Sequence, residues 1–228
     1  NHRADSPVYK LQEKLKMFIK LITLVVILGV ANGFIFAPKY KKRVIPTVPK
    51  LDAALYIGRW YQMYTNKQAT TFTGQDQHCT SATYQLKDAT TITVLNSGKI
   101  GSPTGRWSQI TGYAEQVNAT GDPGKFALHL QYVPFTGSYW IIKLGPVINN
   151  QYAYSVVTTN DGGQLYVLAR NKDTFKDLYE KEILEFCKEK EFTEDVLKPI
   201  PTPQEPTCPY ANKKLTTLEE DIITGITG

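Results

Sequence analysis

Short stretches in which apolar and polar residues alternate fill the middle of this chain of 228 residues. The alternation is clearest between Phe126 and Tyr132, where every second side chain is apolar. A period of two indicates strands that bury one face. Eight such segments are predicted, at residues 57–66, 79–87, 91–97, 106–116, 125–133, 138–145, 151–159 and 164–170.

Residues that favour tight turns separate these segments. Gly-Asp-Pro-Gly at 121–124 and Asn-Asp-Gly-Gly at 160–163 tolerate the backbone angles that hairpin turns need. Eight short strands with such turns predict an all-β fold, either a sandwich or an antiparallel up-and-down barrel. The periodicity alone does not separate these two architectures.

The pattern changes to that of a helix after Arg170. Asp173 or Thr174 can cap a helix that runs from about 174 to 188 and packs outside the strands. The tail from about residue 199 is rich in proline and is predicted to be irregular. The apolar stripe of this helix consists of Phe175, Tyr179, Ile183 and Cys187, widened by Leu178 and Phe186.

The first fifty residues have a different character. Residues 17–33 combine a basic residue, a short apolar run and small residues, which is typical of a secretory signal peptide; a transmembrane anchor is the alternative. Residues 1–16 are interpreted as a leader or non-native segment. Residues 34–50 are a basic, proline-containing linker, and Arg43 in it is either a propeptide processing site or part of a solvated arm.

Net charge and amino-acid composition exclude several classes of protein for this chain. The net charge of +5 suggests nucleic acid or a membrane surface as partner, but residues 1–33 carry five Lys or Arg and two Asp or Glu. Removal of residues 1–33 leaves a net charge of +2, and the loss of four more basic residues up to Arg43 leaves a net charge of −2. We therefore expect no nucleic-acid partner. A hydrophobic content of 42% excludes a disordered chain, and three cysteines are too few for a disulfide-dense scaffold.

Two short motifs resemble signatures of the lipocalin family. Gly58-Arg59-Trp60 opens the strand series and residues 168–171 (Leu-Ala-Arg-Asn) close it, directly before the helix. Residues 79–86, 110–114 and 137–142 are similar to the apolipoprotein D group and its bacterial and invertebrate relatives. The resemblance covers about residues 48–210, and residues 144–146 (Leu-Gly-Pro) depart from the family's second signature.

The resemblance implies an eight-stranded antiparallel up-and-down barrel with one C-terminal α-helix packed outside. The lipocalin domain is expected at 51–210, with a C-terminal tail at 211–228. Gly58, Trp60 and Arg170 are then structural signature residues, with the Arg170 guanidinium across the Trp60 indole. This pair would join the first strand to the last.

The family function implied is extracellular binding and transport of a small hydrophobic ligand, such as a fatty acid, sterol or retinoid. The inward side chains either fill the barrel as core or line a cavity, and the resemblance favours the cavity. The alternatives are a carrier for a bilin or carotenoid pigment and a defence or interaction module that uses its loops. The expected ligand-binding positions are Ala82, Tyr84, Ile92, Val94, Ile110, Gly112, Leu128, Leu130, Tyr139, Ile141, Tyr166 and Leu168.

The resemblance also assigns the cysteines and a modification. It pairs Cys79 with Cys208 in a disulfide, which leaves Cys187 on the helix as a buried thiol. Asn118-Ala119-Thr120 is a glycosylation sequon in a predicted turn, as expected for a secreted glycoprotein.

We expect no enzymatic activity, cofactor or metal. His78 and His129 are far apart in the sequence, and His129 has outward parity, so the two do not suggest a catalytic or zinc-binding group. The remaining expected partners are a lipid particle or cell-surface receptor, and the chain is expected to be a monomer or a weak homo-oligomer.

Overall fold

The computed structural model describes residues 40–74 and 76–210, and the text below concerns the compact unit that begins at Lys42. The predicted leader at 1–16, the signal peptide at 17–33 and the tail at 211–228 lie outside the described residues. Among the residues described, no helix is long and apolar enough to cross a membrane.

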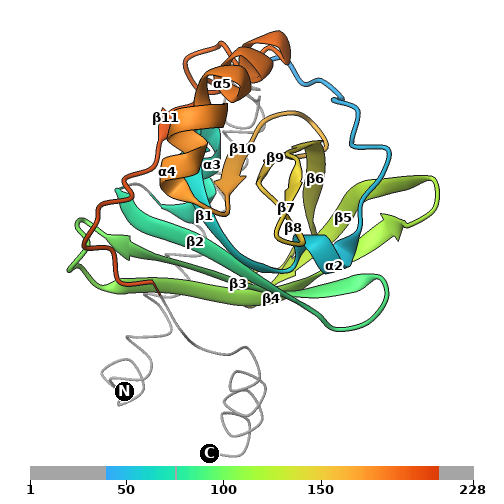
Figure 1. The fold of residues 1–228 in the computed structure, drawn as a ribbon, viewed down its shortest axis with the longest axis horizontal. Coiled ribbons are helices and arrows are strands. Elements are labelled where there is room, and N and C mark those ends of the chain that lie inside the picture. The colour runs from blue at the N-terminus through green and yellow to red at the C-terminus, as the bar shows by residue number, and fades with distance from the viewer. Residues whose placement is uncertain (1–39, 75, 211–228) are drawn as a thin grey trace, which may run out of the picture. The chain divides into compact units, whose positions relative to one another are not determined.

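Eight antiparallel strands form a closed barrel, as predicted (Figure 1). Each strand pairs with its neighbour along the chain, and β10 returns to pair with β1, with Tyr61 opposite Ala169. Side chains point alternately into and out of the barrel along each strand, and in β4 the outward positions Gln109, Tyr113 and Glu115 are exposed while the inward positions between them are not. The barrel strands are β1 (Gly58–Thr65), β2 (Gln77–Leu86), β3 (Thr91–Ile100), β4 (Trp107–Asn118), β5 (Asp122–Leu130), β6 (Gly137–Leu144), β9 (Tyr154–Thr158) and β10 (Leu165–Ala169).

The connections fall into two sets at opposite ends of the barrel. One end carries α3 (Lys67–Thr73) and the loops at 101–106, 131–136 and 159–164. The other carries α2 (Ala53–Tyr56), the turns at 87–90 and 119–121, and a small hairpin of β7 (Val147–Ile148) and β8 (Gln151–Tyr152). This hairpin follows directly on residues 144–146, where the sequence departs from the family signature.

The segment predicted as a linker packs against the barrel. The backbone N–H of Val48 donates a 2.9 Å hydrogen bond to the carbonyl of Ile141 in β6, and Thr47 contacts Asp122 at the start of β5. A Cβ on Gly124 would lie 2.8 Å from the Cβ of Thr47, so this close approach needs glycine. Residues 43–51, which we call the N-terminal arm, therefore form part of the folded domain.

The predicted helix is present outside the barrel but begins earlier. It comprises α4 (Lys172–Thr174), the π-helical turn η1 (Phe175–Tyr179) and α5 (Glu180–Glu189). Asn171, not Asp173 or Thr174, is the N-cap: its side chain accepts a hydrogen bond from the Thr174 N–H. Leu178 is exposed, against prediction, because the wider π turn moves it off the buried stripe.

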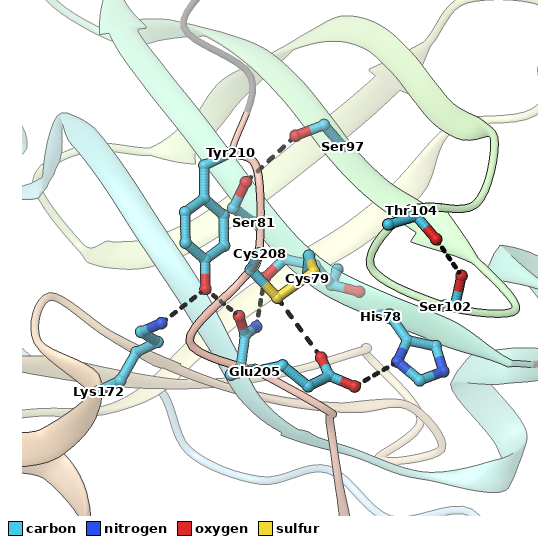
Figure 2. Close-up of a disulfide and its surroundings, with 12 residues drawn as sticks. His78, Cys79, Ser81, Ser97, Ser102, Thr104, Lys172, Glu205, Cys208 and Tyr210 are labelled. Atoms are coloured by element: carbon cyan, nitrogen blue, oxygen red, sulfur yellow. Dashed lines mark hydrogen bonds and ion pairs between the residues drawn. A yellow bond between two sulfur atoms is a disulfide. The ribbon is translucent and has the colours of Figure 1, made fainter.

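The C-terminal strap (residues 200–210) runs along the outside of β1 and β2. Its strand β11 (Ile200–Pro201) pairs with β1, although this region was predicted to be irregular. The predicted disulfide between Cys79 and Cys208 is confirmed and fixes the strap to β2 (Figure 2). Beside it, the Glu205 carboxylate lies 2.7 Å from His78 Nδ1.

Candidate functional site

The end of the barrel near α2 is closed by Trp60. Its side chain is fully buried, its indole N–H donates to the Tyr56 carbonyl, and the Arg170 Cζ lies 3.6 Å from its ring centroid. Arg170 also donates to the backbone carbonyls of residues 55–57 and 59. Burial lowers the pKa of Arg170 to about 10, so the guanidinium remains charged at neutral pH.

The predicted ligand-binding residues come together inside the barrel. Ten of the twelve belong to one interior cluster or pack against it. The other two, Ile110 and Gly112, share the parity of Ala114 in β4, a member of that cluster. The ten residues in the cluster or packed against it are Ala82, Tyr84, Ile92, Val94, Leu128, Leu130, Tyr139, Ile141, Tyr166 and Leu168.

Exposure differs around the inner wall. Ala82, Tyr84, Ile92, Val94, Ile141 and Leu168 are buried, whereas Ile110, Gly112, Leu128, Leu130, Tyr139 and Tyr166 are half-buried although they share the inward parity. Residues of the two groups are paired at the same level of the barrel, as Val94 of β3 is with Gly112 of β4. The inner wall on β2 and β3 is therefore packed, and the half-buried residues, most of them on β4 and β5, line the part that solvent reaches, which we call the cup.

Sequence reasoning missed several interior residues. Phe126 was predicted on the apolar face with Leu128 but was not included among the ligand-binding positions, although it is buried in the interior cluster. Tyr56 is buried in the short helix α2, for which no periodicity gave a signal. Tyr132, predicted on the apolar face with Phe126, is instead 92% exposed, because β5 ends at Leu130 and the backbone turns at Tyr132 with φ of 64°.

Four hydroxyl groups meet in the interior. The Tyr56 hydroxyl lies 2.6 Å from that of Tyr139 and 2.9 Å from Ser155 Oγ, and the Tyr84 hydroxyl lies 3.2 Å from that of Tyr139. Burial raises the pKa of Tyr56 to about 12 and raises the pKa of Tyr84 and Tyr139 as well. All three phenols are therefore protonated at neutral pH.

The interior cluster is uncharged. Its described members are aliphatic, aromatic or phenolic, and none is Asp, Glu, Lys or His. Tyr166, the remaining phenol of the wall, donates its hydroxyl to the side-chain oxygen of Gln164 at 2.6 Å. Such a lining suits a hydrophobic molecule with few polar atoms.

A hollow of about 540 Å³ lies beside α2, at the same end of the barrel as the turns at 87–90 and 119–121. Its wall includes Leu51, Leu86 and Gln116, together with the turn at 87–89. Asp88 there accepts hydrogen bonds from the backbone of Thr90 and Thr91, so its carboxylate stabilises the turn. This hollow is open to solvent.

His78 and His129, the two histidines that the structure describes, lie on the outer surface of the barrel. His129 stacks on Tyr113 at 4.6 Å between ring centroids, and His78 lies beside Glu205. Within the described part of the chain, Glu205, Cys79 and Cys208 have potential ligand atoms close together, but both sulfurs are in the disulfide and offer no thiolate. Asn118 is exposed in the β4–β5 turn, and its glycosylation stays a prediction.

A family model described as a lipocalin-like domain matches residues 51–202. The chain is 28% identical over 182 residues to temperature-induced lipocalin-1 of Arabidopsis thaliana, covering 75% of this chain and 89% of the relative. It is 29% identical over 143 residues to the outer membrane lipoprotein Blc of Escherichia coli, and the match covers 62% of this chain and 74% of that relative. Mouse apolipoprotein D is 34% identical over 99 residues, and the match covers 42% of this chain and 48% of apolipoprotein D.

Solved structures share the fold at low sequence identity. A biogenic amine-binding protein superposes with a TM-score of 0.55 at 16% identity, covering 78% of this chain and 95% of the other. Apocrustacyanin C1 superposes with a TM-score of 0.53 at 15% identity, and the superposition covers 77% of this chain and 97% of the other. At these identities the likeness concerns the fold alone.

Proposed function

The chain belongs to the lipocalin family, and on this basis we propose that its barrel binds and carries one small hydrophobic molecule, such as a fatty acid, sterol or retinoid. The exposure of apolar side chains on the inner face of the barrel carries the proposal. Leu128, Leu130 and Tyr166 present apolar surface to an open cup above a floor closed by Trp60. Apolar surface that leaves water in such a cup contributes about 25 cal/mol per Å² to binding.

The lining argues against a charged group deep in the barrel, so a fatty acid would keep its carboxylate near the mouth of the cup. A protonated amine or a carboxylate that leaves water needs an opposite charge or several hydrogen bonds. The described members of the interior cluster supply no carboxylate, and Arg170 donates to backbone carbonyls beneath Trp60. A pigment carrier and a loop-based interaction module remain the alternatives; an absorbance spectrum of natively purified protein tests the first.

Two neighbouring residues of β5 provide the test. Leu130 is inward and Leu130→Trp should fill the cup, whereas His129 is outward and His129→Trp adds the same side chain outside. Delipidated protein is titrated with the neutral fluorescent probe N-phenyl-1-naphthylamine, which retinol or oleic acid then displaces. We expect Leu130→Trp to weaken binding at least about tenfold and His129→Trp to leave it within about twofold.

Two outcomes would contradict the proposal. The first is a wild-type protein that binds neither the probe nor any of the lipids. The second is equal loss of binding in both tryptophan variants, because the ligand would then not lie in the cup.

We further propose export of the chain, with a signal peptide at 17–33 and a glycan on Asn118. The disulfide supports this because such bonds persist in oxidising compartments. Mass spectrometry of protein secreted by a eukaryotic cell gives the mature N-terminus and the mass at Asn118. A mature chain that retains residues 1–33, or an unmodified Asn118, would remove the corresponding part of the proposal.

A further inference from the structure

Four hydroxyl groups from separate elements form one linear chain of hydrogen bonds inside the barrel. Ser155 of β9 contacts Tyr56 of α2, Tyr56 contacts Tyr139 of β6, and Tyr139 contacts Tyr84 of β2, at 2.9, 2.6 and 3.2 Å. We call these residues the hydroxyl chain. It links strands on different sides of the barrel to the helix that closes it.

The number of donors in this chain exceeds the number of bonds. Each hydroxyl has one proton to donate and two lone pairs that accept. Four hydroxyls joined by three hydrogen bonds use three protons, so one O–H has no acceptor within the chain. A ligand that covers this donor without offering an acceptor leaves it unsatisfied, which costs free energy, and a ligand oxygen at this point avoids that cost.

Exposure decides which hydroxyl presents that proton to the cup. Tyr56, Tyr84 and Ser155 are 1%, 3% and 0% exposed, whereas Tyr139 is half-buried. Tyr139 is also the central member, with Tyr56 on one side and Tyr84 on the other. When both neighbours donate to Tyr139, and Ser155 donates to Tyr56, the free proton is on Tyr139.

We propose that Tyr139 donates this hydrogen bond to an uncharged oxygen of the ligand, such as a carbonyl or a hydroxyl group that enters the cup first. The inference rests on the proposed function and specifies its ligand class. The neutral state of the phenols and the absence of a charged residue among the described members of the cluster favour a neutral oxygen over a carboxylate. Tyr139 is thus a specificity-determining residue.

A ketone and its alkene isostere isolate the contribution of the ligand oxygen. Tridecan-2-one and 2-methyltridec-1-ene have the same shape, and only the ketone accepts a hydrogen bond. Both compete against N-phenyl-1-naphthylamine for delipidated protein, and the measured quantity is the ratio of their dissociation constants in each variant. The ketone and the alkene differ in aqueous solubility, but this difference affects the ratio equally in every variant and cancels when wild type and variant are compared.

Three Tyr→Phe variants make the same chemical change at different places. Tyr139→Phe removes the donor, and we expect the preference for the ketone to fall by about tenfold, as for one hydrogen bond. Tyr84→Phe leaves three hydroxyls and two bonds, so one proton remains on Tyr139 and the preference should stay within about twofold. Tyr113→Phe, on the outer face of β4 against His129, is the control and should also leave the preference unchanged.

The outcomes separate this inference from the proposed function. If both compounds bind wild type and Tyr139→Phe leaves their ratio unchanged, the donor role of Tyr139 is wrong while hydrophobic binding stands. If Tyr84→Phe or Tyr113→Phe lowers the preference as much as Tyr139→Phe, the effect is not specific to the Tyr139 hydroxyl and the inference is again wrong. If neither compound displaces the bound probe, the inference about Tyr139 is wrong, whereas the proposed function is contradicted only if the protein binds neither the probe nor any of the lipids.

Discussion

The guanidinium of Arg170 lies over the indole of Trp60, with 3.6 Å between the Arg170 Cζ and the ring centroid. Arg170 follows β10 and Trp60 lies in β1, so the pair spans the seam where the barrel closes. The hydrogen bonds from Arg170 to the carbonyls of Tyr56 and Ile57 connect the same seam to α2. One side chain thus holds the first strand, the last strand and the closing helix together.

Arg170→Lys should lower the free energy of unfolding by about 2–4 kcal/mol. An ammonium group keeps the charge but cannot form the planar fork that contacts several carbonyls and the indole face. Urea unfolding followed by tryptophan fluorescence measures the loss. Arg106→Lys, the same change at an exposed position, should stay within about 0.5 kcal/mol of wild type; equal losses in both variants would contradict the assigned role.

The arm provides a second test of stability. Arg43 Nε donates to the Lys190 carbonyl at 2.8 Å, and its Cζ lies 4.5 Å from the centroid of buried Phe192. We expect Arg43→Ala to lower the free energy of unfolding by about 1–2 kcal/mol. Lys42→Ala, at an exposed position, is the control. A chain cut after Arg43 would lose the same contacts, so unchanged stability of such a chain would show that the Arg43 contacts contribute nothing.

The strands could be predicted from the sequence because only one face of each barrel strand points inward, so apolar residues recur at every second position. The predicted segment at 138–145, for example, is strand β6 at Gly137–Leu144. The same alternation placed Tyr139 and Ile141 on the inner face, where the structure has them. Their role in ligand binding stays a prediction.

The parts that sequence reasoning missed depend on contacts between distant residues. Tyr56 lies in a helix of four residues, too short for a periodic signal, and it is buried only because α2 folds over the barrel end. The N-terminal arm has no hydrophobic periodicity. It packs closely against β5 at Gly124, where a side chain would collide with Thr47. Leu178 follows the helical pattern in sequence, but a π turn, which the sequence does not signal, rotates it outward.

The cysteines predict a simple pattern of thiol reactivity. With Cys79 and Cys208 paired, Cys187 is free and fully buried, and burial raises the pKa of its thiol to about 12. Native protein should therefore react with 5,5′-dithiobis(2-nitrobenzoate) at no cysteine within minutes, and unfolded, unreduced protein at one per chain. Three reactive thiols after unfolding would contradict the disulfide, and rapid reaction of native protein would contradict the burial of Cys187.

Alkaline titration tests the buried phenols. Burial raises the folded-state pKa of Tyr56 from 10.0 to about 12, so the folded protein holds this proton more tightly than the unfolded chain does. The stability from Tyr56 is therefore fully present below pH 10 and is lost as the pH rises towards 12, by about 2–3 kcal/mol. Urea unfolding between pH 8 and 12 measures this slope, which Tyr56→Phe should reduce and Tyr132→Phe, at a 92% exposed position, should not. If the two variants keep the same slope as wild type, Tyr56 ionises freely in the folded barrel and the hydroxyl chain is not buried as described.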